Sequence, residues 1–253
     1  MTTTPSDNLS GLSPCVIGAT GGSGTRVVAR IVRAAGMYIG DDLNRYEDAL
    51  PFAALSDRWI NAYVESGARP GDDVRQAMTE ELAALVEEHV SHRPGDAAGW
   101  GWKEPRSIYL LPFLNETMPK LRFLHFVRDG RDMAFSENQQ QLKKHGDAAL
   151  DRRLRWQRRP YRSVALWAHV NGTAADYGER ELGERYLRVR FEDLCTRPGE
   201  TAGHILDFFG LEGDADAIAA AEVRPPSTLA RWKTKGSRTI AKLEQLGERS
   251  LSR

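Results

Sequence analysis

The segment Cys15-Val16-Ile17-Gly18-Ala19-Thr20-Gly21-Gly22-Ser23-Gly24-Thr25-Arg26 decides the expected fold of this chain. Its apolar start ends in glycines, which predicts a short buried strand, and a helical pattern runs from about Thr25 to Gly36. A glycine-rich turn at a helix N-terminus exposes backbone N–H groups and the positive end of the helix dipole. The segment therefore predicts an anion-binding loop, although the same glycines could serve only a tight turn that packs the helix on the strand.

Beyond this loop, short apolar runs alternate with longer helical patterns, which is typical of βα units around a parallel sheet. Further strands are expected at 100–102, 121–127 and 186–191, and helices at 57–67, 72–92, 130 to about 144, around 164–170, and 198–210. We expect a single three-layer α/β domain over residues 1–253. It would have a central parallel sheet, a helical insertion at about 41–98 and a less regular tail at about 224–253.

The composition narrows the possible partners. The 35 basic and 35 acidic residues give a net charge of +0, so no global field favours DNA or RNA as a partner. No stretch reaches the roughly 18 apolar residues of a membrane span, and residues 1–14 lack a signal-peptide pattern, so we expect a soluble, cytoplasmic protein. Cys15 and Cys195 are expected to be reduced core thiols, and no metal site is expected because their spacing is not that of metal ligands.

Two common glycine motifs fit the loop poorly. A Walker loop fails because Ala19 stands five residues before Gly24 and Thr25 occupies the position of the lysine. The spacing of Gly18, Gly21 and Gly24 matches short-chain dehydrogenases, which bind NAD or NADP, but no tyrosine has a lysine four residues after it. A second hydrophobic strand that ends in an acid is also missing, so this reading stays as the alternative.

Four separated motifs, in order, resemble the sulfotransferases that use 3′-phosphoadenosine 5′-phosphosulfate (PAPS). The loop ends in S-G-T-R at 23–26, and F-V-R-D-G-R-D-M-A-F-S at 126–136 is similar to the 3′-phosphate motif of that family. W-K-E-P at 102–105 is similar to its K-x-P turn, and R-F-E-D-L at 190–194 to its Y-E-D-L strand end. The resemblance implies a P-loop-like sulfotransferase fold and transfer of a sulfuryl group to a hydroxyl or amine of a small-molecule or carbohydrate acceptor, with PAP as the other product.

The resemblance also assigns the donor-binding residues. The loop would hold the 5′-phosphosulfate through Gly22, Ser23, Gly24, Thr25 and Arg26. The 3′-phosphate would be held by Arg128 and Ser136, which lie on one side of a helix start, where N–H groups and the dipole favour an anion. The alternative for Arg128 and Ser136 is a helix cap and an ion pair with Asp129 or Asp132.

One departure from the family bears on catalysis. Many members carry a lysine where this chain has Gly22, so another cation must stabilise the charge that builds on the leaving oxygen. We expect Lys103 to supply it, and the alternative is a structural ion pair between Lys103 and Glu104. With Gly22 in that position, a relative that binds the nucleotide without transferring sulfate also stays possible.

The base that accepts the acceptor's proton has several candidates. By similarity to tyrosyl-protein sulfotransferases, Asp42 or Asp41 could supply it, and the alternative is that they cap a helix beginning near Asn44. Glu104 is a further candidate base, whereas His125 lies in an apolar strand pattern and is expected in the core.

Two other segments have weaker signals. Around Arg231 and Trp232 the chain resembles the family's C-terminal segment that closes over the donor. The arginine-rich run 152–162, which also holds Trp156 and Tyr161, could flank an anionic ligand but is most simply a solvated helix face.

Overall fold

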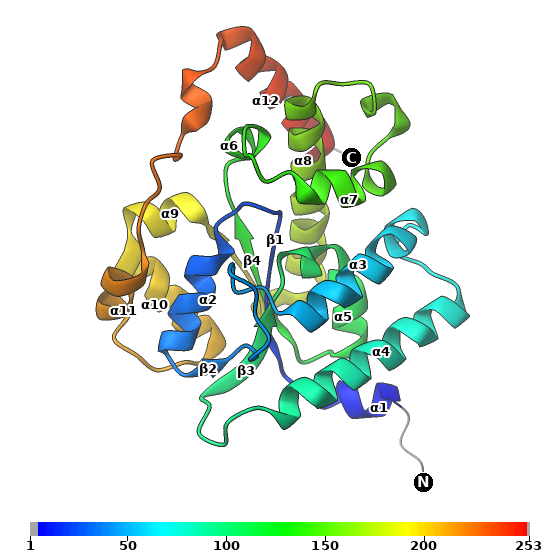
Figure 1. The fold of residues 1–253 in the computed structure, drawn as a ribbon, viewed down its shortest axis with the longest axis vertical. Helices are drawn as coiled ribbons and strands as arrows, with labels where there is room; N and C mark the ends of the chain where they lie inside the picture. Colours follow the sequence, from blue (N-terminus) through cyan, green and yellow to red (C-terminus); the bar gives the residue numbers. More distant parts are fainter. Residues whose placement is uncertain (1–4, 252–253) are drawn as a thin grey trace.

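A five-stranded sheet forms the centre of the computed structural model, which describes the backbone of residues 5–251 and the side chains of residues 8–248. Its strands are β1 (Cys15–Ala19), β2 (Met37–Tyr38), β3 (Gly99–Lys103), β4 (Arg122–Val127) and β5 (Tyr186–Arg190). They lie in the order β2-β3-β1-β4-β5, and every neighbouring pair is parallel (Figure 1). The predicted α/β class with a central parallel sheet is confirmed.

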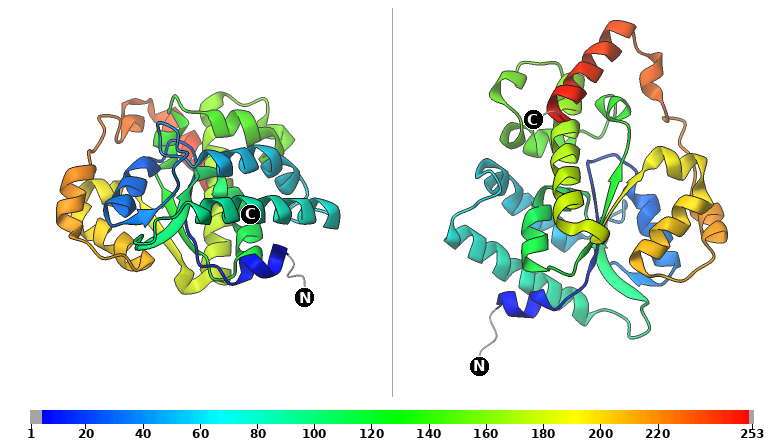
Figure 2. Two further views of the ribbon diagram at one scale, coloured as in Figure 1. Left: turned by 60° about the horizontal axis from the view of Figure 1, so that its bottom comes forward. Right: turned by 180° about the vertical axis from the view of Figure 1, so that it is seen from behind.

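Helices cover both faces of the sheet. They are α1 (Pro5–Ser10), α2 (Thr25–Ala34), α3 (Leu50–Glu65), α4 (Asp72–Ser91), α5 (Leu111–Thr117), α6 (Gly130–Ala134), α7 (Gln140–Ala149), α8 (Arg159–Tyr177), α9 (Phe191–Thr196), α10 (Pro198–Phe209), α11 (Ala215–Glu222) and α12 (Ser237–Leu251). Short 3₁₀ turns include η1 (Pro105–Leu110), η2 (Arg152–Leu154) and η5 (Arg231–Thr234). Figures 1 and 2 show α2, α10 and α11 on one side of the sheet and α3, α4, α5 and α8 on the other.

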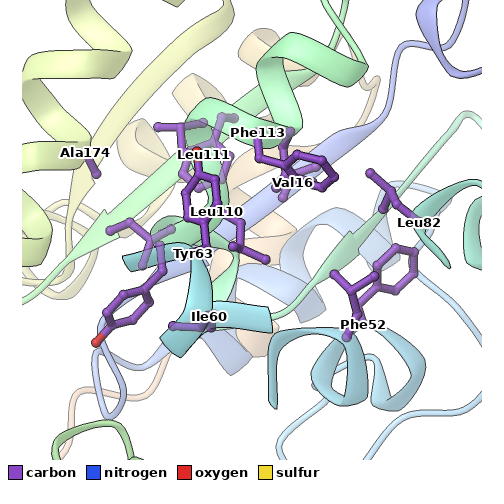
Figure 3. Close-up of a cluster of buried hydrophobic side chains, with 14 of the residues drawn as sticks. Val16, Phe52, Ile60, Tyr63, Leu82, Leu110, Leu111, Phe113 and Ala174 are labelled. Atoms are coloured by element: carbon purple, nitrogen blue, oxygen red, sulfur yellow. The ribbon is translucent and has the colours of Figure 1, made fainter. Parts of the chain in front are cut away.

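The alternation of side chains along β1 explains the two cores. Cys15, Ile17 and Ala19 point to the α2 side, where they join a cluster with residues of α10. Val16 points to the opposite face and joins the larger cluster, which includes Phe52 of α3 and is shown in Figure 3. Because the strand is buried on both faces, it is apolar throughout rather than alternating in hydrophobicity.

The strand register brings the sequence motifs to one edge of the sheet. Ile17 of β1 pairs with Lys103 of β3, and Ala19 pairs with Phe126 of β4. The chain segments that follow these strands therefore leave the sheet side by side, at its carboxyl edge. In open α/β sheets ligands bind at this edge.

Two helix predictions need correction. The helix expected at 130–144 is interrupted, because the Gln139 side chain takes over the carbonyls of Met133 and Ser136 at 3.0 and 2.9 Å and closes α6. The tail is more regular than expected, since α12 spans Ser237–Leu251 and buries Leu243 completely against α8. The interruption leaves Ser136 outside a helix, beside the glycine loop.

The insertion between β2 and β3 also differs in detail. Its first helix begins at Leu50 rather than near Asn44 or Asp57, with Pro51 in the first turn. The Asn44 side chain instead closes a turn by accepting hydrogen bonds from the N–H groups of Tyr46 and Asp48. The alternative interpretation, in which Asp41 or Asp42 caps a helix near Asn44, is therefore wrong.

Candidate functional site

The glycine loop folds as a turn with free backbone donors at the start of α2. Gly22 and Gly24 both have φ of +90°, a region that favours glycine. Gly24 is the N-cap residue of α2, and no side chain of residues 8–248 caps the helix, so its first N–H groups have no side-chain acceptor there. The Ser23 hydroxyl closes the turn by donating to the Thr20 carbonyl at 2.6 Å. Uncapped N–H groups at a helix start favour a bound anion.

Ser136 lies directly against this loop. A Cβ atom built on Gly22 would sit 3.2 Å from the Ser136 hydroxyl oxygen and 3.2 Å from Cε of Met133. A lysine at position 22 would therefore combine an unfavourable positive φ with crowding of both side chains. The two motifs predicted to bind phosphate therefore meet here, and the positive φ of position 22 favours the glycine that departs from the family pattern.

Arg128 follows the last residue of β4 and is 5% exposed. Its guanidinium carbon lies 4.6 Å from the ring centroid of Phe191, and that ring packs against Gly24, where a Cβ would come within 2.8 Å of it. Phe191 thus connects the arginine to the start of α2. Nε of Arg128 is buried and has no hydrogen-bond partner in the described part of the chain. A buried, unpartnered N–H on a permanent cation is a strong anion-binding feature.

The C-terminal segment crosses this arginine. Nη2 of Arg128 donates to the Thr228 carbonyl at 3.1 Å and to Asp132 at 3.3 Å, so the ion pair weighed as an alternative does form. Asp132 is 1% exposed and also accepts the N–H groups of Ala230 and Trp232 at 2.8 and 3.2 Å. Asp132 therefore ties the tail to the arginine, a role that the sequence pattern did not indicate.

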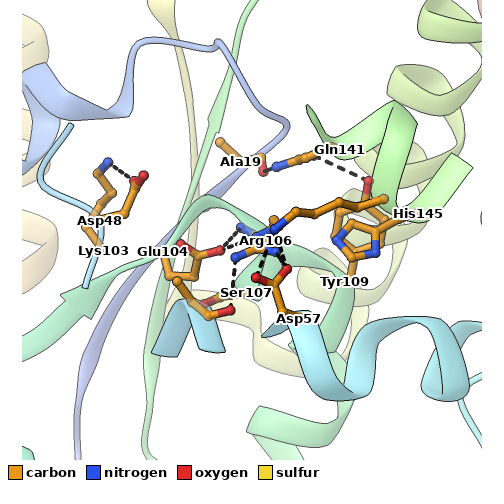
Figure 4. A network of polar contacts seen from close by, with 12 residues as sticks. Ala19, Asp48, Asp57, Lys103, Glu104, Arg106, Ser107, Tyr109, Gln141 and His145 are labelled. Atoms are coloured by element: carbon orange, nitrogen blue, oxygen red, sulfur yellow. Dashed lines mark hydrogen bonds and ion pairs between the residues drawn. The ribbon is translucent and has the colours of Figure 1, made fainter. Parts of the chain in front are cut away.

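Lys103 is the last residue of β3, on the other side of β1, where it is buried and forms an ion pair. Its ammonium group forms an ion pair with Asp48 and donates to the Tyr46 carbonyl at 2.7 Å (Figure 4). Burial lowers the pKa of Lys103, and the attraction of Asp48 opposes that shift. Its partner is therefore Asp48 rather than Glu104, and the expected role at the leaving oxygen stays a prediction.

Glu104, the next residue, belongs to a separate charged network. It is 1% exposed and accepts a hydrogen bond from Nε of Arg106 at 2.6 Å. Arg106 also pairs with Asp57 (Figure 4). The same carboxylate accepts a hydrogen bond from Lys144 of α7 at 2.6 Å. Burial raises the pKa of Glu104, while the charge of Arg106 counteracts this shift. A carboxylate with a raised pKa is a stronger proton acceptor.

Gln141 and His145 of α7 contact the end of β1, η1 and α3. Gln141 donates to the Ala19 carbonyl at 3.4 Å and accepts from the Tyr109 hydroxyl at 3.3 Å (Figure 4). His145 is 1% exposed, its Nδ1 is 2.8 Å from Oδ1 of Asn61, and its Nε2 has no partner among the described residues. Burial lowers the pKa of His145 to about 4, so the ring is neutral at pH 7. No sequence motif indicated this histidine.

The remaining predicted residues lie at more open positions. Thr25 is buried in the first turn of α2, and Arg26 beside it is exposed, with no ion pair to any described residue. Asp42 is exposed, and among residues 8–248 its side chain has no hydrogen-bond partner, whereas Asp41 accepts from the Tyr38 hydroxyl at 3.2 Å. The structure thus brings the loop, Ser136 and Arg128 together, but it leaves Asp42 in solvent.

The predicted core residues are mostly placed as expected. His125 is completely buried, with hydrogen bonds to Tyr186 at 2.6 Å and to Asn171 at 2.7 Å. Burial lowers the pKa of His125 to about 4. Both cysteines are free, and Cys195 is only partly buried, so the expectation of a core thiol holds for Cys15 alone.

An open cavity of about 670 Å³ adjoins Arg128 on the side of α8 and α12. Its polar lining includes Arg188 and Arg190 of β5 and Asp176 and Glu179 near the end of α8. Arg188 pairs with Glu179 at 3.1 Å, so these charges largely balance each other. Among the side chains of residues 8–248 there is no group of three or more that could ligate a metal ion, and no described helix could span a membrane.

The fold is that of an open α/β protein with a parallel central sheet, and its unpartnered donors lie at the carboxyl edge of that sheet. The model of the sulfotransferase family matches residues 21–216, which is most of the chain. The chain therefore belongs to the sulfotransferase family. No curated protein matches it in sequence.

Solved structures agree in fold at low sequence identity. A sulfotransferase from Mycobacterium avium is 12% identical with a TM-score of 0.58, and the match covers 95% of this chain and 76% of that one. The sulfotransferase domain from the curacin biosynthetic pathway is 12% identical with a TM-score of 0.55, covering 94% and 97%. A sulfotransferase from Alicyclobacillus acidocaldarius is 13% identical with a TM-score of 0.54, covering 96% of both chains. These matches identify the P-loop-like sulfotransferase fold.

Proposed function

We propose that this chain transfers a sulfuryl group from PAPS to a hydroxyl or amine of a small-molecule or carbohydrate acceptor. The observation that carries the proposal is the meeting of two anion-binding features at one edge of the sheet. The uncapped start of α2 lies against Ser136, and the buried Arg128 keeps an unpartnered N–H. A donor with phosphate groups at both its 5′ and 3′ positions would use both features, whereas ATP would use only the first.

The residues present fit that donor. The loop N–H groups and the exposed Arg26 would hold the 5′-phosphosulfate, and Arg128 with Ser136 would hold the 3′-phosphate. The Asp132 carboxylate already orients Arg128 and fixes the tail across it. Because Arg128 is held before any ligand binds, little conformational entropy is lost on binding.

Glu104 is the residue we propose as general base. In the reaction, an acceptor oxygen or nitrogen bonds to sulfur, the bond from sulfur to the phosphate oxygen breaks, and the acceptor's proton moves to the base. Glu104 leaves β3 at the same edge as the loop, and burial raises its pKa. Arg106 fixes its orientation at 2.6 Å. Asp42 is the weaker candidate because its side chain is exposed and not oriented by any described residue.

Negative charge that builds on the leaving oxygen needs a cation, and we propose Lys103 for this role. A purely structural ion pair with Asp48 is the competing explanation for the buried Lys103.

The alternative function, an NAD(P)-dependent dehydrogenase, has no observation in its favour, since β2 has only two residues and no acid at its end.

A thermal-shift panel tests the donor. The purified protein is measured with PAP, 5′-AMP, ATP and NADP, because a ligand at about 100 times its Kd adds roughly 2.7 kcal/mol to the stability. We expect PAP to raise the Tm while 5′-AMP and ATP do not. A shift with NADP alone would contradict the proposal. Transfer of labelled sulfate from PAPS then distinguishes an enzyme from a relative that only binds the nucleotide.

A further inference from the structure

The connection between α7 and α8 concentrates positive charge that the protein itself does not neutralise. Residues 147–162 hold six arginines and two aspartates. Asp147 pairs with Arg162 at 2.9 Å and with Arg155 at 4.0 Å, and Asp151 accepts the N–H of Arg153. Four guanidinium groups are exposed and have no ion pair with any residue in the described part of the chain, namely Arg152, Arg153, Arg158 and Arg159.

An almost fully exposed tryptophan lies among these arginines. Trp156 is 92% exposed, whereas the other large exposed hydrophobic side chains among residues 8–248, Tyr46 and Leu50, are 47% and 40% exposed. Trp156 follows the short turn η2, on a connection that runs along the outside of the molecule (Figure 1). An exposed indole beside unpaired cations is an interaction surface rather than part of a core.

We propose that the loop 152–159 binds the surface of an anionic lipid bilayer. The unpaired arginines would contact the headgroups, and the Trp156 indole would lie at the boundary between headgroups and acyl chains. Tryptophan is enriched at that boundary, and each basic residue close to an anionic membrane adds to the attraction. Because the whole chain has a net charge of +0, the attraction would come from this loop and not from the protein's overall field.

A lipid surface fits this loop better than a folded protein does. A specific protein interface covers about 800 Å² on each partner and needs a shaped surface, whereas this loop offers one aromatic side chain and exposed cationic ones. A bilayer needs only charge and an interfacial aromatic group. Behind the loop, Lys242 of α12 donates to Gln157 at 3.2 Å and lies 4.2 Å from the centroid of the Tyr161 ring. This contact supports the base of the loop and adds another cation.

Co-sedimentation with lipid vesicles tests the proposal. The full chain is mixed with vesicles of phosphatidylcholine alone, or of phosphatidylcholine and phosphatidylglycerol in equal amounts. We expect binding only to the anionic vesicles, weakening as salt is added. The variant R152E/R153E/R158E/R159E should bind about a hundredfold or more weakly, and W156A about tenfold. The control R180E/R197E alters two exposed arginines that are paired elsewhere, and it should bind nearly as well as the wild type.

All substituted side chains are exposed, and an unchanged Tm and an unchanged circular dichroism spectrum will show that the variants are folded. Equal binding to neutral and anionic vesicles would overturn the proposal, as would full binding by the quadruple variant. Retention on polyuridylate without binding to vesicles would also overturn it and would indicate a single-stranded nucleic acid as the partner. None of these results depends on sulfuryl transfer, so this proposal can fail while the proposed function stands.

Discussion

The two halves of the carboxyl edge differ in how their polar groups are used. Around β1 and β4, some hydrogen-bond donors have no acceptor in the described part of the chain. The start of α2 has no side-chain cap there, and Arg128 has a buried N–H without a partner. Around β3, the charges satisfy one another, since Lys103 pairs with Asp48 and Glu104 with Arg106. Unused buried donors cost stability, so they indicate a ligand, whereas paired charges hold a shape.

The unpartnered donors of the β1–β4 half therefore support the proposed anion site, whereas the ion pairs of the β3 half orient one carboxylate and anchor the insertion. Arg106 joins η1 to Asp57 of α3, and Lys144 joins α7 to the same carboxylate. The β3 half is therefore held in place by ion pairs between segments that lie far apart in the sequence.

The largest effect on turnover is expected from replacing Glu104, the proposed base in the β3 half. Glu104→Gln keeps the shape of the side chain and a hydrogen-bonding oxygen for Arg106 but removes the base. We expect kcat to fall by roughly a hundredfold or more while PAP affinity changes little. Steady-state kinetics and calorimetry with PAP measure the two separately, and Asp42→Asn serves as the control. If Asp42→Asn lost more turnover than Glu104→Gln, the assignment of the base would be reversed.

The pH dependence sharpens the same assignment. A base must be deprotonated to act, and burial raises the pKa of Glu104. We therefore expect kcat to fall on the acid side at a pH above the ordinary pKa of a glutamate. A plot of kcat against pH measures this limb. An acid limb at or below that ordinary value would argue against Glu104.

Lys103→Met tests whether the pairing beside β3 is only structural. The change leaves Asp48 and the Tyr46 carbonyl without their partner, so we expect a loss of about 3 kcal/mol in unfolding free energy. We also expect turnover to fall more than donor affinity, because Lys103 is proposed to act at the leaving oxygen. Urea unfolding and kinetics measure the two effects.

The double variant K103M/D48N provides the control, since it removes both charges of the pair. Stability should recover in part, and turnover should stay low. Recovery of turnover together with stability would show that Lys103 only holds the fold.

A smaller effect is expected from filling the glycine loop. Gly22→Ala places a Cβ at positive φ, 3.2 Å from the Ser136 hydroxyl, so PAP affinity should fall about tenfold. Gly22→Lys should weaken PAP binding further, although many relatives carry lysine there. Gly67→Ala is the matched control, because it has φ of +66° with open space around it. Improved transfer by Gly22→Lys would show that the loop can accommodate the usual lysine.

The smallest expected effect concerns His125 in the core. Its pKa is lowered to about 4, so below pH 6.5 the unfolded state binds a proton that the folded state does not. Stability from this group is complete above pH 6.5 and is lost as the pH falls toward 4. Between pH 7 and 5.5 the loss should be about 1 kcal/mol, and His125→Gln should reduce it. An identical pH dependence in wild type and variant would contradict this account.

The features that could be predicted from the sequence are those that a continuous local pattern encodes. The apolar run, the glycines and the following helix of the first βα unit were visible, as were Arg128 and Ser136, because each lies within one continuous motif. The partners of Lys103 and Arg106 were not, since Asp48 and Asp57 lie 55 and 49 residues earlier and no local spacing links them. The orphan nitrogen of His145 likewise depends on packing between α3 and α7.

The most direct test of the account measures whether Arg128 recognises a 3′-phosphate. Calorimetry compares PAP with 5′-AMP on the wild type, on Arg128→Ala and on Arg190→Ala, a control that removes an exposed arginine at the end of the neighbouring strand. We predict that the wild type prefers PAP by roughly a hundredfold, that Arg128→Ala loses this preference and that Arg190→Ala keeps it. Equal binding of PAP and 5′-AMP by the wild type, or an unchanged preference in Arg128→Ala, would contradict the account.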